Sequence, residues 1–77
     1  MTPRQTVLSV LSRVSGVPEA KIEDHHHLTA DLGMDSVTAV EFLAEAMEAL
    51  GVELDIESTA GVETVADCIA MAEQACG

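Results

Sequence analysis

The chain has 77 residues, of which 48% are hydrophobic and a single one is aromatic, and its formal net charge is −11. This length suits one small domain over residues 1–77 with a thin core, and the apolar share is too high for a disordered acidic tail. All three Lys and Arg residues lie before position 22 and thirteen of the fourteen acids lie after it, which argues strongly against nucleic-acid binding and favours partners with basic patches.

The first predicted helix covers residues 2–15. Thr2 is a suitable N-cap, Pro3 suits the first helical position, and Gln5 completes a capping-box pattern. An apolar stripe at helical spacing should face the core, made of Val7, Leu8, Leu11 and Val14. Gly16 is a good residue to end this helix, because glycine adopts the left-handed conformation readily.

Residues 17–34 should form a long loop, held against the core by Ile22, Leu28 and Leu32. This loop contains three consecutive histidines, His25-His26-His27. Adjacent side chains on an irregular loop rarely converge on one ion. We therefore expect a solvated polar segment and no metal site there.

A second helix is predicted over residues 36–50, with Asp35 as its N-cap and Gly51 at its end. Its apolar residues fall into two groups at about 100° per residue. The first group should be the core stripe, which comprises Ala39, Phe42, Leu43, Ala46 and Leu50. The second group, with its flanking acids, is a candidate docking surface that we call the docking face: Val37, Val40, Glu41, Ala44, Met47 and Glu48. Burial is an equally good interpretation for Val40 and Met47, whereas the other apolar members should be exposed.

Two further helices complete the prediction, a short third one near residues 56–61 and a last one over residues 64–76. The third should contact the core through Leu54, Ile56 and Val62. Thr64 with Asp67 resembles a capping box for the last helix. Its apolar stripe comprises Val65, Cys68, Ile69 and Ala72 and could extend to Cys76. Cys68 should be buried, and Cys76 should be a free thiol near the fraying end. The expected fold is an all-α four-helix bundle with a short third helix and a long loop between the first and second helices.

The chemistry of the chain centres on Ser36, the first residue of the second predicted helix. A hydroxyl near the positive end of a helix dipole is a favourable place for a phosphate. No histidine–acid pair is spaced to activate this serine, and neither a glycine-rich phosphate loop nor a metal-binding Cys/His set is present. Ser36 is better interpreted as a substrate of another enzyme, through phosphorylation or attachment of a larger phosphate-linked group. No membrane-spanning run or signal peptide is found, so we expect a soluble, cytoplasmic, non-catalytic protein.

The stretch Asp31-Leu32-Gly33-Met34-Asp35-Ser36-Val37, followed by Val40-Glu41, resembles the phosphopantetheine attachment site of acyl carrier proteins. The usual pattern there is Asp-Leu-Gly-x-Asp-Ser-Leu, with Val-Glu a few residues further on. The resemblance covers nearly the whole chain, including the Gly-Val pair after the first helix and Thr64-Val65 at the start of the last. Val37 replaces the common leucine, which trims the contact next to the serine.

The resemblance implies that Ser36 receives 4′-phosphopantetheine from coenzyme A through a separate Mg²⁺-dependent phosphopantetheinyl transferase. Asp35 would cap the helix and support that encounter. The thiol of the arm would carry acyl groups as thioesters in fatty-acid or polyketide-type biosynthesis. The docking face of this monomeric carrier would meet basic patches on the transferase and on acyl-loading, condensing and processing enzymes. One hypothesis places the acyl chain between the helices, where small residues leave room: Ala39, Ala46 and Ala72.

Two alternatives stay open. A peptidyl or aminoacyl carrier of a non-ribosomal pathway resembles this fold, but such carriers often have Gly-Gly-x-Ser or Gly-Gly-His-Ser at the attachment point. Met34-Asp35 favours the acyl type. In a different functional class, an acidic helical adaptor would use Ser36 only as a cap or a phosphorylation site.

Overall fold

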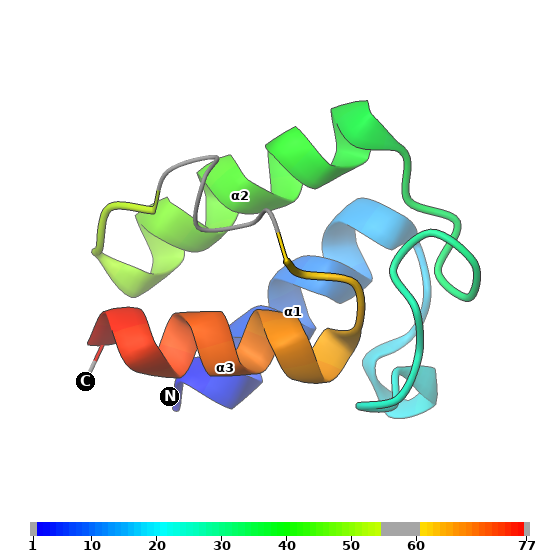
Figure 1. Ribbon diagram of the computed structural model, residues 1–77, viewed down its shortest axis with the longest axis horizontal. Coiled ribbons are helices and arrows are strands. Elements are labelled where there is room, and N and C mark those ends of the chain that lie inside the picture. The colour runs from blue at the N-terminus through cyan, green and yellow to red at the C-terminus, as the bar shows by residue number, and fades with distance from the viewer. Residues whose placement is uncertain (1, 55–60, 77) are drawn as a thin grey trace.

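The computed structural model describes residues 2–54 and 61–76. Its helices are α1 (Pro3–Ser15), α2 (Ser36–Leu50) and α3 (Val65–Cys76), with one 3-10 turn, η1 (Glu19–Lys21), and these described ranges contain no strand. In Figure 1, α1 lies behind the other two helices, with α2 above it and α3 below. The all-α class is therefore confirmed. The predicted short helix near residues 56–61 lies almost entirely outside the described residues, so the bundle seen here has three helices.

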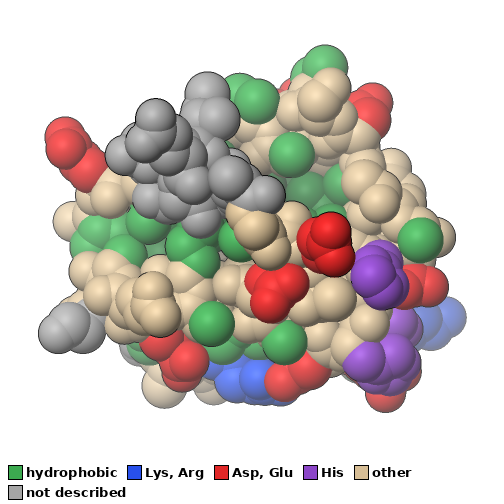
Figure 2. All heavy atoms as spheres, viewed as in Figure 1, with side chains coloured by type: hydrophobic (Ala, Val, Ile, Leu, Met, Phe, Trp, Pro, Cys, Tyr) green, Lys and Arg blue, Asp and Glu red, His purple; other side chains and the backbone are tan. Residues whose placement is uncertain are grey.

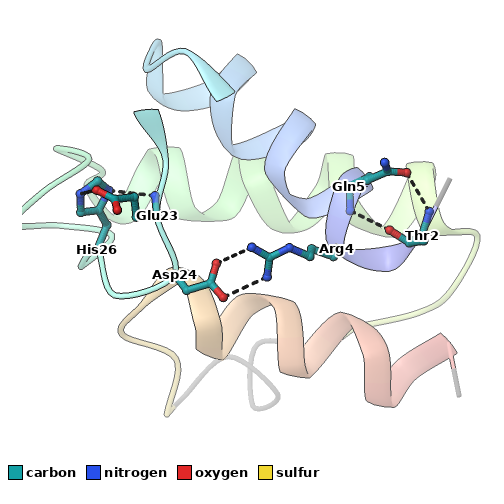
Figure 3. Close-up of polar contacts among 6 residues, drawn as sticks. All are labelled: Thr2, Arg4, Gln5, Glu23, Asp24 and His26. Atoms are coloured by element: carbon teal, nitrogen blue, oxygen red, sulfur yellow. Dashed lines mark hydrogen bonds and ion pairs between the residues drawn. The ribbon is translucent and has the colours of Figure 1, made fainter. Parts of the chain in front are cut away.

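Helix α1 begins with the capping box that its sequence predicts. The Gln5 amide donates to Thr2 Oγ1 at 3.2 Å, and the Thr2 amide donates to Gln5 Oε1 at 3.3 Å (Figure 3). The helix ends at Gly16, which has a φ of +80°. Its buried face is wider than the predicted stripe, because Thr6 and Val10 are also buried. A wider face is needed because α1 packs against two helices.

Helix α1 is the centre of the packing. It packs against both α2 and α3, whereas α2 and α3 approach each other far less. The core draws on all three helices and on the long loop through Ile22, Leu32 and Met34. Ala39 was expected in the core stripe but is exposed. This expectation was wrong because Ala39 faces a hollow between α2 and α3 and not α1. Leu50, at the end of α2, is only half-buried.

The long loop is fastened to both neighbouring helices. The Val65 amide donates to the His26 carbonyl at 3.0 Å, and the Ala66 amide donates to the Asp24 carbonyl at 2.9 Å. These bonds satisfy two of the amides that the first turn of α3 leaves without partners. The Arg4 guanidinium on α1 holds the Asp24 carboxylate in a two-bond pair, at 2.9 and 2.7 Å (Figure 3). The loop therefore has a defined path.

Helix α3 has the second predicted capping box. The Asp67 amide donates to Thr64 Oγ1 at 3.2 Å, and the Thr64 amide donates to Asp67 Oδ2 at 3.1 Å. Cys68 is buried and Cys76 is exposed, as expected. Burial, with a smaller contribution from the charge of Asp67, raises the pKa of the Cys68 thiol to about 12. Across the described part of the chain, no helix has the length and apolar character to cross a membrane.

Candidate functional site

The loop before α2 is shaped by a compact turn. The Asp31 amide donates to the His27 carbonyl at 2.9 Å, and the His27 amide donates to Asp31 Oδ2 at 2.6 Å. Gly33 has a φ of +69°, in the left-handed region where glycine carries no steric cost. Leu32 and Met34, on either side of it, are 6% and 3% exposed. These two buried side chains anchor the turn and fix where α2 begins.

Asp35 caps α2 with its carboxylate. Asp35 Oδ1 accepts hydrogen bonds from the Thr38 amide at 2.8 Å and from the Thr38 hydroxyl at 2.9 Å. These bonds lower the pKa of the Asp35 carboxyl below its usual range, the backbone amide having the larger effect. Asp35 is therefore ionised at neutral pH. The next residue, Ser36, is the first residue of α2 and is exposed, which confirms the predicted helix start.

The surroundings of Ser36 do not form a catalytic triad. His27, Asp35 and Glu63 line the same groove as Ser36. Within residues 2–54 and 61–76, however, no hydrogen bond joins the Ser36 hydroxyl to a histidine or a carboxylate. A serine without a bonded base is a weak nucleophile. Attack by the Ser36 hydroxyl would therefore need a base from outside the described residues.

The groove beside Ser36 has a volume of about 500 Å³. Its lining combines polar residues with four apolar ones, which are Leu28, Met34, Ala39 and Val62. The same four residues also line a smaller, mostly apolar pocket of about 170 Å³ between α2 and α3, which Phe42, Cys68 and Met71 help to enclose. The groove and the pocket are therefore contiguous. Of the three alanines expected to leave room for an acyl chain, Ala39 lines this pocket, but Ala46 and Ala72 are buried elsewhere in the core.

The docking face lies along α2, directly after Ser36. Val37 and Val40 are 65% and 59% exposed and are the large hydrophobic residues most open to solvent in the described chain. Glu41, Ala44 and Glu48 are also exposed, whereas Met47 is half-buried. The interpretation that Val40 is buried is thus wrong. Two exposed valines flanked by carboxylates form an apolar patch with an acidic edge.

Sequence reasoning missed part of the groove. Met34 was not expected to be buried, although an apolar residue two positions after Leu32 in a polar turn is a sign of burial. Glu63 was not singled out at all, and Val62 was expected only as a contact of the third helix. Val62 and Glu63 reach the groove because the Leu28 amide donates to the Glu63 carbonyl at 3.0 Å. No local sequence pattern encodes that long-range pairing.

Comparison with known proteins places this geometry in a family. The family model of the phosphopantetheine attachment site matches residues 5–72. The chain is 30% identical over 69 residues to an acyl carrier protein of Prochlorococcus marinus. The aligned region covers 90% of this chain and 86% of that protein. It is also 39% identical over 56 residues to a non-reducing polyketide synthase of Stachybotrys chartarum. That second match covers 73% of this chain but only 2% of the synthase.

Proposed function

Because the chain belongs to the phosphopantetheine-attachment family of acyl carrier proteins, we propose that Ser36 is the residue that holds its 4′-phosphopantetheine arm. The protein is a non-catalytic carrier of acyl groups in fatty-acid or polyketide synthesis, modified and used by separate enzymes. The position of the Ser36 hydroxyl supports the assignment most directly. It is exposed on the first turn of α2, where amides and the helix dipole favour a phosphodiester.

The other described serines do not have this position. Ser9, Ser12 and Ser15 all lie within α1, and the Ser15 hydroxyl donates to the Leu11 carbonyl at 2.5 Å. Ser36 alone among the described serines opens a helix beside an ionised capping carboxylate. It also lines a groove that shares four of its lining residues with an apolar pocket.

The proposed attachment is a phosphoryl-group transfer. The Ser36 oxygen attacks the β-phosphate of coenzyme A and forms a new phosphate ester. The bond to the nucleotide breaks, so that 3′,5′-ADP leaves with the electron pair. The proton of the Ser36 hydroxyl passes to a base on the transferase, since the described residues offer Ser36 no bonded base of their own.

The test is incubation with coenzyme A, Mg²⁺ and a phosphopantetheinyl transferase of broad specificity, followed by intact mass measurement. We expect the mass to rise by one phosphopantetheinyl group and the Ser36→Ala variant to stay unmodified. Ser9→Ala is the matched control and should be loaded like the wild type. An unchanged mass for the folded wild-type chain would refute the assignment and favour the acidic adaptor.

We infer that the docking face receives the transferase and the acyl-loading, condensing and processing enzymes. Its exposed valines offer apolar contact, and Glu41 and Glu48 at its edge suit partners with basic patches. A carrier must leave each partner quickly, and weak contact steered by charge permits that. We also propose that the protein is a monomer and acts in the cytoplasm. Light scattering and cell fractionation would test these two points.

The apolar pocket between α2 and α3 is our proposed site for the acyl chain. Its walls carry Met34 and Met71, whose methyl groups are sensitive NMR reporters. An octanoyl thioester should shift both methyl resonances, whereas an acetyl thioester should leave them near their positions in the unacylated protein. Identical spectra for the two forms would contradict sequestration.

A separate experiment distinguishes acyl from aminoacyl carriers. The holo protein would be offered both to acyl-loading enzymes and to amino-acid-adenylating enzymes. We expect acylation only, because Met34 stands two residues before Ser36, where peptidyl carriers often have glycine, and Asp35 stands where some of them have histidine. Charging with an amino acid alone would favour the non-ribosomal alternative.

A further inference from the structure

We propose that Glu23, His25 and His26 form a binding site for a divalent transition metal ion of the Zn²⁺ type. One ligand atom from each of these residues lies within 4.8 Å of the other two. The site is separate from Ser36 and independent of the carrier function. Figure 3 shows Glu23 and His26 facing each other on the loop, and Figure 2 shows the histidines gathered at one end of the viewed face.

The backbone beneath this cluster is held in place. The His26 amide donates to the Glu23 carbonyl at 3.1 Å and closes the turn. The His26 and Asp24 carbonyls accept bonds from the first turn of α3, and the Asp24 carboxylate is paired with Arg4. The three candidate ligands therefore project from a turn tied to two helices. This is why adjacent residues converge here, where the sequence alone gave no reason to expect it.

The distances are compatible with coordination after small side-chain rotations. Zn²⁺ binds imidazole nitrogen and carboxylate oxygen at about 2.0–2.2 Å, so tetrahedral ligand atoms lie roughly 3.3–3.5 Å apart. His26 Nε2 and Glu23 Oε2 are already 3.7 Å apart. Glu23 and His25 are exposed, and their side chains can rotate without disturbing the core.

The ligand set also selects the class of metal. Two imidazole nitrogens with one carboxylate oxygen suit Zn²⁺, Ni²⁺ or Cu²⁺, whereas Mg²⁺ and Ca²⁺ prefer oxygen ligands in larger number. The neighbouring Asp24 carboxylate is occupied by Arg4. Three protein ligands therefore leave the fourth tetrahedral position to water or to an outside ligand.

The structure supplies a specific reporter of metal binding. The Glu23 amide donates to His26 Nδ1 at 3.1 Å, which places the proton of a neutral imidazole on Nε2. Coordination through Nε2 moves that proton to Nδ1 and breaks the bond from the Glu23 amide. The Glu23 amide resonance should therefore respond strongly to the metal, and the amide of Ser36, which lies outside the cluster, should not follow it.

The test is a Zn²⁺ titration of the chain in a Cys76→Ser background, so that the exposed thiol cannot bind the metal. Amide NMR spectra would report the site, and competition with a chromophoric chelator would give the affinity. We expect His25→Gln and His26→Gln each to weaken Zn²⁺ binding about tenfold or more. The Glu23→Gln variant should also bind Zn²⁺ more weakly than the parent protein. His27→Gln is the matched control, because His27 is the neighbouring histidine outside the cluster, and it should bind like the parent.

Circular dichroism would first establish that every variant is folded. The proposal is overturned if Zn²⁺ binds no more tightly than Mg²⁺. It is also overturned if His27→Gln loses as much affinity as His25→Gln, or if Zn²⁺ shifts the carboxylate-bearing residues of α2 as much as Glu23. Any of these results would mean diffuse attraction to an acidic surface.

Discussion

Replacing Val37 and Val40 with alanine tests whether partners dock beside Ser36. Each substitution removes two methyl-sized groups, worth about 0.8 kcal/mol each when buried. At 65% and 59% exposure, most of that area is still available for burial by a partner. Docking would therefore gain about 1 kcal/mol from each valine, and its loss should lower kcat/KM for phosphopantetheine transfer about fivefold. The folded state should lose little stability, because the side chains already face water.

The assay is the initial rate of transfer to Ser36, followed by intact mass at carrier concentrations below KM. The two valines lie three residues apart and meet the same partner surface, so the double variant should fall by between about fivefold and 25-fold. Val14→Ala, on α1, is the matched control and should transfer at the wild-type rate. A double variant within twofold of wild type would show that the docking face lies elsewhere. An equal loss in Val14→Ala would point to a general change of the fold.

Three further outcomes are expected from other parts of the molecule. At pH 8 an alkylating agent should label Cys76 and spare Cys68. Burial raises the pKa of the Cys68 thiol from 9.0 to about 12, which leaves about a thousandfold less thiolate to react. Equal labelling of the two cysteines in native mass spectra would contradict this burial. Hydrogen bonds lower the pKa of Asp35 and Asp67 below 3.8 in the folded state, so their stabilisation is complete above that pH and is lost as the pH falls through the folded values. Circular dichroism during acid titration should therefore show unfolding only below about pH 4, and at higher pH in Asp67→Ala. Added NaCl should raise the melting temperature, because thirteen acids follow Lys21 without any Lys or Arg; a flat response would show that the acids are too dispersed to matter.

Local sequence signals predicted most of the helical framework. The bounds of α2 agree with the prediction at both ends, since Asp35 caps its start and Gly51, with a φ of +69°, ends it. The capping boxes at Thr2 and Thr64 were also predicted. Caps and turns depend on side chains within four residues of the helix end, so one sequence is enough to find them.

The features that the sequence did not predict all depend on contacts between distant segments. Ala39 has the spacing of a core residue, yet it is exposed and lines the pocket between α2 and α3. Glu63 reaches the groove through a backbone bond to the loop, and His25 and His26 converge because α3 fixes their turn. Helical periodicity gives a residue's direction on its own helix and not the position of the neighbouring helix.

Because α1 packs against both other helices, α3 can unfold while α1 and α2 stay paired. Helix α3 is held by α1 and by the loop carbonyls, and only weakly by α2. Release of α3 would therefore leave the pairing of α1 with α2 intact, so α3 should exchange its amide hydrogens as one cooperative unit, at a lower free energy than global unfolding. Cys68 and Met71 leave the wall of the apolar pocket in the same event. Partial unfolding of α3 would therefore open the pocket on a second side, in addition to its connection with the groove beside Ser36.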